Sequence, residues 1–249
     1  GAGIACGTAR AGSPVVLIDR DLEAAAKGKG YSEDLVKKGV QKGKTTKEEG
    51  EKLLSLISTS TDHADLADAD LVIEAVFEDR DVKKAVTESI EAQIRPTTVY
   101  ASNTSTLPIT GLAKNSKRPK NFIGIHFFSP VDKMMLVEII LGRKTSDKAL
   151  AVALDYVAAI KKTPIVVNDT RGFFVNRCVL RYMNESYNML AEGVPPAMIE
   201  NAAKMAGMPV GPLSLNDEVA IDLSLKIVRA TIADLGEKAV DPRHLALVE

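Results

Sequence analysis

The 249-residue sequence contains no tryptophan, only two cysteines and only three histidines. Cys6 and Cys178 lie far apart and lack the close spacing of metal ligands, so we expect free thiols in a reducing compartment, cytoplasmic or otherwise intracellular. The histidines, His63, His126 and His244, are too dispersed to indicate a metal site, and we expect none.

An excess of either charge and any long apolar run are also missing. Lys and Arg total 32 and Asp and Glu total 33, so the sequence has no electrostatic footprint for nucleic acid or a membrane surface. The apolar runs are far shorter than a bilayer span, and we expect neither a membrane helix nor a signal peptide. With 45% hydrophobic residues, the chain can build one large domain or two modest ones.

Short apolar runs alternate with helical patterns through the first two thirds of the sequence. Runs without polar alternation indicate buried parallel strands, and they are predicted at 15–18, 71–76, 98–101, 122–125 and 164–167. Helices are predicted at 21–42, 46–57, 82–94 and 146–160. After residue 168 only helices are predicted, at 172–192, 196–206 and 213–235, separated by Gly-Val-Pro and Gly-Met-Pro.

This change of pattern predicts two domains. We expect an α/β domain with a Rossmann-type doubly wound sheet over residues 1–168, followed by an all-helical domain over residues 169–249. In open sheets of this kind, ligands bind at the carboxyl ends of the strands, so polar residues that follow strands are the candidates for function.

One such residue is His126, which follows the apolar run at 122–125. A second apolar run, at 134–140, carries a single carboxylate, Glu138. An imidazole at a strand end and a carboxylate among apolar residues suit a general base and the group that orients it. For this pair taken alone, a core histidine and an unrelated glutamate is the simpler interpretation.

Two further strand ends carry polar residues. Asp19 follows the run at 15–18, where a carboxylate accepts hydrogen bonds from the adenosine ribose and repels a ribose phosphate, which favours NAD over NADP. The polar turn at 102–106 follows the run at 98–101. The alternative interpretation of Asp19 is an acidic residue that begins a loop. The alternative for the polar turn is that its side chains cap the next helix.

Four motifs in order, SNTSTLPIT, IGIHFFSPVDKMMLVE, DTRGFFVNR and GMPVGP, make the sequence resemble the L-3-hydroxyacyl-CoA dehydrogenase family over essentially its whole length. The sequences of these motifs are most similar to the dehydrogenase part of multifunctional β-oxidation enzymes. The resemblance implies NAD-dependent oxidation of L-3-hydroxyacyl-CoA to 3-ketoacyl-CoA in fatty-acid β-oxidation, by a homo-oligomer or a multifunctional enzyme. Alternatives are a dehydrogenase of another 3-hydroxy acid and a catalytically silent nucleotide-binding subunit.

The resemblance also implies roles for individual residues. His126 would be the catalytic base and Glu138 its partner, Ser105 would contact substrate and nicotinamide, and Asn176 would supply an amide that polarises the thioester side of the substrate. NAD would bind at Gly1, Gly3, Asp19, Glu78, Lys83 and Ser105, and acyl-CoA at Lys42, Ser105 and Asn176. Many members of the family have an asparagine at the position of Ser129. The serine hydroxyl can still form a hydrogen bond there, but it has a shorter reach than the asparagine amide.

The first residues resemble the inside of a glycine fingerprint of the form GxGxxGxG. We expect Gly1 to be its third glycine and residues 1–11 to begin a helix at the cofactor cleft. On this interpretation a central strand precedes Gly1, because its neighbours would otherwise leave buried backbone groups unpaired. We also expect the native chain to extend beyond Glu249.

Overall fold

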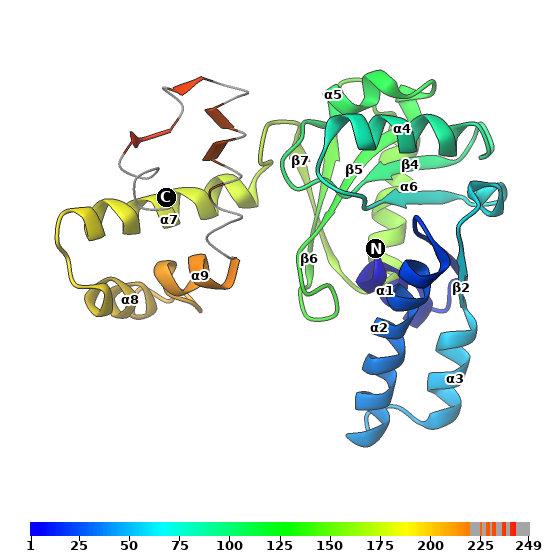
Figure 1. Ribbon diagram of the computed structural model, residues 1–249, viewed down its shortest axis with the longest axis horizontal. Helices are drawn as coiled ribbons and strands as arrows, with labels where there is room; N and C mark the ends of the chain where they lie inside the picture. Colours follow the sequence, from blue (N-terminus) through cyan, green and yellow to red (C-terminus); the bar gives the residue numbers. More distant parts are fainter. Residues whose placement is uncertain (220–224, 226–227, 230, 233–235, 238–239, 243–249) are drawn as a thin grey trace. The chain divides into compact units, whose positions relative to one another are not determined.

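The computed structural model describes residues 1–219, 225, 228–229, 231–232, 236–237 and 240–242. The chain forms two compact units, which divide between Phe174 and Val175. Figure 1 shows the mixed α/β first unit and the helices of the second.

The first unit alternates helices and strands as expected. Its principal elements are α1 (Ala2–Arg10), β1 (Val15–Ile18), α2 (Leu22–Gln41), α3 (Lys47–Ser55), β2 (Ile57–Ser60), β3 (Leu71–Glu74), α4 (Arg80–Glu91), β4 (Val99–Ser102), α5 (Ile109–Leu112), β5 (Phe122–Phe127), β6 (Leu136–Leu141), α6 (Asp147–Ala159) and β7 (Thr163–Asn168). The strands form a parallel β1–β2 pair and a five-stranded sheet in the order β3-β4-β5-β6-β7. The predicted α/β class with a Rossmann-type sheet is confirmed.

Within the larger sheet, one pairing runs against the others. β3, β4 and β5 are parallel, whereas β6 is antiparallel to β5 and parallel to β7. The buried strand at 122–125 is therefore parallel to one neighbour only. The reversal matters because it places residues of β5 and β6 directly opposite each other.

The prediction of a helix at 46–57 was wrong at its carboxyl end. Thr46 begins α3 with a capping box completed by Glu49, but the helix stops at Ser55. Ile57 then begins β2, which pairs with β1 from Val15 onward. The run Ile-Ser-Thr-Ser has one apolar residue, so its strand conformation comes from pairing with β1 and not from a local apolar pattern.

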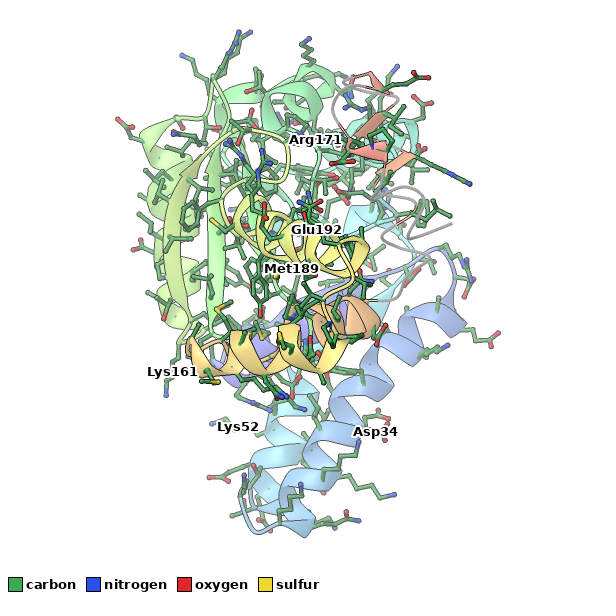
Figure 2. All side chains as sticks on the ribbon, turned by 90° about the vertical axis from the view of Figure 1, so that its left-hand side faces the viewer. Asp34, Lys52, Lys161, Arg171, Met189 and Glu192 are labelled. Atoms are coloured by element: carbon green, nitrogen blue, oxygen red, sulfur yellow. The ribbon has the colours of Figure 1, made fainter. Side chains whose placement is uncertain are left out.

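The small-residue segment at the start forms α1, as expected. Close packing explains the glycine at position 28 of α2, because a Cβ there would lie 2.7 Å from Cδ2 of Leu17 in β1. Farther along, α2 and α3 carry charged side chains on their outer faces, such as Asp34 and Lys52 (Figure 2).

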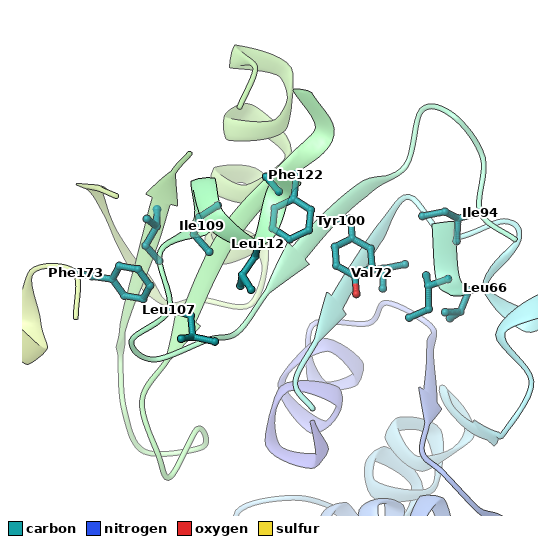
Figure 3. Packing of buried hydrophobic residues seen from close by; sticks show 12 residues of the cluster. Leu66, Val72, Ile94, Tyr100, Leu107, Ile109, Leu112, Phe122 and Phe173 are labelled. Atoms are coloured by element: carbon teal, nitrogen blue, oxygen red, sulfur yellow. The ribbon is translucent and has the colours of Figure 1, made fainter. Parts of the chain in front are cut away.

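The core of the first unit lies on both faces of the larger sheet. One cluster joins α4 and α5 to Tyr100 and Phe122, whose rings stack with centroids 5.3 Å apart (Figure 3). The other joins α1 and α6 to Ile123, Ile125 and Ile139. Successive strand residues point to opposite faces, so a strand covered on both faces needs an unbroken apolar run.

The second unit contains α7 (Val175–Ala191), α8 (Pro196–Met205) and α9 (Pro212–Val219). The helix predicted at 172–192 begins three residues late, because Gly172 and Phe173 have left-handed backbone conformations, with φ of 73° and 52°. The helix predicted at 213–235 is seen as α9, and most of its remaining range lies outside the described residues. No helix in the described part of the chain has both the length and the apolar character to cross a bilayer.

Candidate functional site

His126 and Glu138 are directly opposite each other in the antiparallel ladder of β5 and β6. The imidazole Nδ1 lies 2.7 Å from Oε2 of Glu138, and the residues are only 3% and 0% exposed. An ionised carboxylate can only accept, so beside ionised Glu138 the proton is on Nδ1, and in the neutral form of the imidazole Nε2 keeps its lone pair. The arrangement leaves Nε2 as the atom that can receive a proton.

The surroundings of this pair are apolar but supply a second donor to the carboxylate. The Phe174 N–H donates to Oε1 of Glu138 at 3.0 Å. The rings of Phe128 and Phe173 flank the imidazole, with centroid distances of 4.5 and 5.8 Å. A buried carboxylate needs such partners, because an unpaired charge in an apolar setting is strongly disfavoured.

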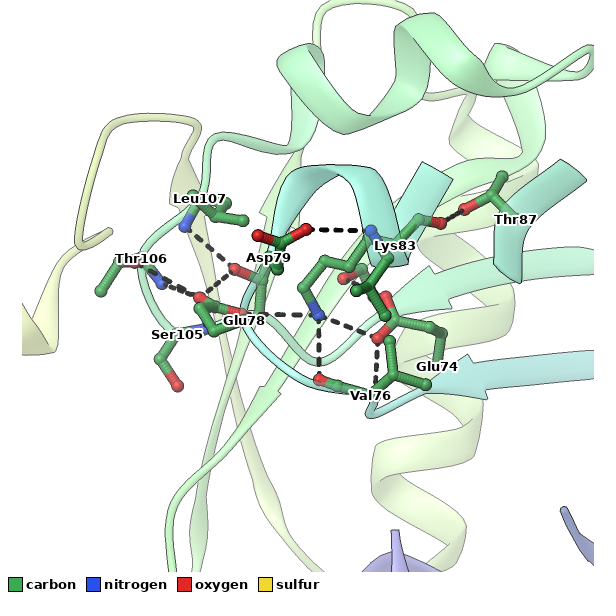
Figure 4. A network of polar contacts seen from close by, with 12 residues as sticks. Glu74, Val76, Glu78, Asp79, Lys83, Thr87, Ser105, Thr106 and Leu107 are labelled. Carbon is green, nitrogen blue, oxygen red and sulfur yellow. Dashed lines mark hydrogen bonds and ion pairs between the residues drawn. The ribbon is translucent and has the colours of Figure 1, made fainter. Parts of the chain in front are cut away.

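A second group of polar residues follows β3 and β4 (Figure 4). The Lys83 ammonium, 2% exposed, donates to Oε1 of Glu74 at 2.8 Å and lies 3.4 Å from Oε2 of Glu78. Glu74 also accepts from the Ser102 hydroxyl at 2.8 Å. The group therefore links the carboxyl ends of two adjacent parallel strands.

Glu78 is hydrogen-bonded to the loop at residues 104–106, here called the Ser105 turn. Its Oε1 accepts from the Thr104 hydroxyl at 2.6 Å and from the N–H groups of Ser105 and Thr106 at 3.0 and 3.1 Å. Burial raises the pKa of Glu78, but the hydrogen bond from Thr104, the charge of Lys83 and the two N–H groups outweigh it and hold that pKa below its ordinary value. The carboxylate is thus ionised at neutral pH.

The two polar groups are joined through the end of β4. Asn103, which follows β4, accepts a hydrogen bond at 2.8 Å from the N–H of Phe127, the residue after His126. The structure thus connects the Ser105 turn to the strand end that carries the imidazole. Ser105 itself is exposed.

Sequence reasoning missed Glu74 as a site-forming residue, and it noted Thr104 only as part of the polar turn at 102–106. A signal for Glu74 was available, because it is a lone carboxylate in the apolar run at 71–76, as Glu138 is at 134–140. Thr104 offered no such signal, since a threonine in a polar turn has an ordinary capping role.

The remaining predicted site residues belong to other elements of the chain. Asp19 follows β1 and is exposed, with Oδ1 accepting from the Arg20 N–H at 2.8 Å. Lys42 is the exposed residue that ends α2, a 20-residue helix about 30 Å long. Asn176 lies on α7 in the second unit.

The residues at the start of the first unit fit a dinucleotide. Gly1 is the N-cap of α1, and no side chain caps the first turn, whose N–H groups suit a pyrophosphate. Gly3 lies in that turn, and the carboxylate of Asp19 at the end of β1 suits ribose hydroxyls. Metal ligation has less support, since no three His, Cys, Asp or Glu side chains gather at one place among the described residues.

Comparison with known families gives two matches that together span nearly the whole chain. Residues 1–170 match the profile described as 3-hydroxyacyl-CoA dehydrogenase, NAD binding domain. Residues 172–248 match the profile described as 3-hydroxyacyl-CoA dehydrogenase, C-terminal domain.

Relatives and solved structures agree with these profiles. The fatty acid oxidation complex subunit alpha of Shewanella amazonensis is 42% identical over 235 residues, which are 94% of this chain and 33% of that protein. The chain thus spans about a third of the length of the curated relatives it matches.

Among solved structures, (S)-3-hydroxybutyryl-CoA dehydrogenase from Ralstonia eutropha has a TM-score of 0.92 and 34% identity, covering 100% of this chain and 88% of that one. The 3-hydroxybutyryl-CoA dehydrogenase of Escherichia coli has a TM-score of 0.89 and 34% identity, covering 93% and 50%.

Proposed function

Because the chain belongs to the 3-hydroxyacyl-CoA dehydrogenase family, we propose that it oxidises L-3-hydroxyacyl-CoA to 3-ketoacyl-CoA with NAD, as a step of fatty-acid β-oxidation. The observation that carries the proposal is the buried contact between His126 and Glu138. A catalytically silent nucleotide-binding subunit would have no use for an imidazole held in one tautomer by a buried carboxylate.

His126 acts as the base in this reaction. Its Nε2 accepts the proton of the substrate hydroxyl, and bound NAD would supply the acceptor for the hydride that leaves the same carbon. Glu138 keeps the proton on Nδ1 and stabilises the imidazolium that forms, and this interaction is strengthened because the pair is shielded from water. General-base help of this kind contributes about a hundred- to ten-thousand-fold to the rate.

The remaining roles follow from placement. We assign NAD binding to residues 1–168, through Gly1, Gly3, Asp19 and the Ser105 turn with Glu78. Lys83 is 2% exposed, so it acts by holding Glu78 and not as a surface contact. The helical residues 169–249 contribute Asn176, and Lys42 contacts the CoA moiety of the acyl-CoA substrate. The protein acts inside the cell, as a homo-oligomer or as part of a multifunctional β-oxidation enzyme.

The test measures the oxidation of NADH by the purified chain with acetoacetyl-CoA, monitored through the absorbance of NADH. His126→Ala should lower kcat by about a hundredfold or more and leave the affinity for NADH within about twofold. Glu138→Gln should lower kcat as well, because the imidazolium loses its charged partner.

A matched control is His63→Ala. The His63 Nδ1 lies 2.7 Å from the hydroxyl of Ser89 in α4, and neither residue is part of the proposed site, so the loss of the ring should leave kcat unchanged. Absence of turnover in the wild type, or wild-type rates in both His126→Ala and Glu138→Gln, would refute the proposal. A series of acyl-CoA lengths and free 3-hydroxy acids then defines the substrate.

A further inference from the structure

Residues 169–174, here called the connecting segment, join β7 to α7 and are hydrogen-bonded to the α5 region of the first unit. The two oxygens of the Asp169 carboxylate accept from the N–H groups of Ile109 and Thr110 at 2.6 and 2.7 Å. The Gly172 N–H donates to the Thr106 carbonyl at 3.3 Å. The connecting segment is therefore bound to the stretch that follows Ser105.

Phe173, within this segment, has a left-handed backbone, with φ of 52°. Among the described residues, Lys161 is the other non-glycine residue with positive φ. A bulky side chain disfavours this conformation, which persists only where surrounding contacts determine it. The Phe173 ring supplies those contacts, since the residue is 1% exposed and belongs to the core cluster with Leu107 and Ile109 (Figure 3).

The left-handed pair Gly172–Phe173 turns the chain so that the next N–H, that of Phe174, points at Glu138. It donates to Oε1 at 3.0 Å, while Oε2 of the same carboxylate holds the imidazole of His126 at 2.7 Å. A carboxylate rotates as a rigid plane, so a donor on one oxygen sets the direction in which the other oxygen accepts. The backbone conformation of Phe173 is thereby coupled to the orientation of the imidazole.

We propose that Phe173 is a positioning residue for the His126–Glu138 pair. Its buried ring holds a left-handed backbone, which aims the Phe174 N–H at Glu138 and so fixes the carboxylate against the imidazole. The catalytic part of the proposal rests on the proposed function, whereas the coupling between Phe173 and the His126–Glu138 hydrogen bond does not require turnover.

The first experiment compares Phe173→Ala with Phe173→Gly in the full chain. Both variants lose the ring, but only glycine adopts positive φ freely. Phe173→Gly should therefore retain a kcat about tenfold higher than Phe173→Ala, with the KM for NAD alike in both. The control pair is Lys161→Ala and Lys161→Gly, at an exposed left-handed residue after α6, where the two kcat values should be equal.

The second experiment removes the N–H directly by replacing the Phe173–Phe174 amide with an ester, which keeps both side chains. We expect kcat to fall about ten- to hundredfold, because partners that orient a catalytic group contribute that much to activity. The downfield proton resonance of the His126 Nδ1–H should move in the same variant. An ester at the Lys161–Lys162 amide, whose N–H donates to the Val157 carbonyl at 3.1 Å, should change neither.

The proposal is overturned if the ester variant keeps wild-type kcat, if its Nδ1–H resonance does not move, or if the alanine and glycine variants at Phe173 have equal kcat. If the wild type has no dehydrogenase activity, the proposed function fails by itself. The resonance in the ester variant then decides whether Phe173 positions the pair.

Discussion

Replacing Lys83 by methionine should destabilise the first unit strongly. Methionine has a similar length but no charge, so Lys83→Met leaves the carboxylate of Glu74 buried without its cation. The side chains of Lys83 and Glu74 are only 2% and 1% exposed and lie 2.8 Å apart. Removing one member of a buried ion pair costs about 3–5 kcal/mol, because the remaining charge keeps its desolvation penalty.

The expected loss lies at the lower end of that range, about 3 kcal/mol. Glu74 keeps two hydrogen bonds in the variant, from the Val76 N–H at 2.8 Å and the Ser102 hydroxyl at 2.8 Å. Glu78 keeps its donors from the Ser105 turn. Adding Glu74→Gln to Lys83→Met should restore part of the lost stability, because the buried group is then neutral.

The assay is urea-induced unfolding monitored by circular dichroism. The free energies of unfolding are compared between variants that have equal m-values. The control is Lys47→Met, which removes an exposed pair with Glu51 at 3.8 Å and should cost no more than about 0.5 kcal/mol. A loss below about 1 kcal/mol for Lys83→Met, or equal losses for Lys83→Met and Lys47→Met, would refute the reasoning.

Three further predictions concern single residues. For Glu78→Gln, the lowered pKa of Glu78 means that its carboxylate stabilises the fold at pH values above the ordinary pKa of 4.5. This contribution is lost as the pH falls through the lowered pKa. The difference in the free energy of unfolding between wild type and Glu78→Gln should therefore be larger at about pH 7 than at about pH 3. Asp19→Ala should reduce the preference for NAD over NADP by about tenfold in kcat/KM, and an unchanged ratio would exclude a role for that carboxylate. Gly124→Ala should lower the free energy of unfolding by about 1–3 kcal/mol, because the new Cβ would lie 2.8 Å from the Ile109 side chain and 2.9 Å from Cβ of Ile140. A urea midpoint equal to that of wild type would contradict this packing argument.

Local patterns in the sequence were sufficient to predict most of the elements and two polar residues that meet in the site. Short apolar runs predicted β1, β3, β4, β5 and β7. In β4 and β5, where every residue is buried, the reason is that a strand covered on both faces needs apolar side chains at nearly every position. His126 and Glu138 were noticeable for the same reason, since each is a polar residue in or beside such a run. These are properties of neighbouring residues, which any reader of the sequence can observe.

The tertiary structure alone decided how these elements meet. The antiparallel direction of β6 and its register place Glu138 opposite His126, and a shift of one residue would turn the carboxylate to the other face of the sheet. The strand β2, the burial of Lys83 and the left-handed backbone of Phe173 are likewise absent from local patterns. Each depends on partners distant in the chain, and the free energy of those contacts exceeds the local preferences of the residues involved.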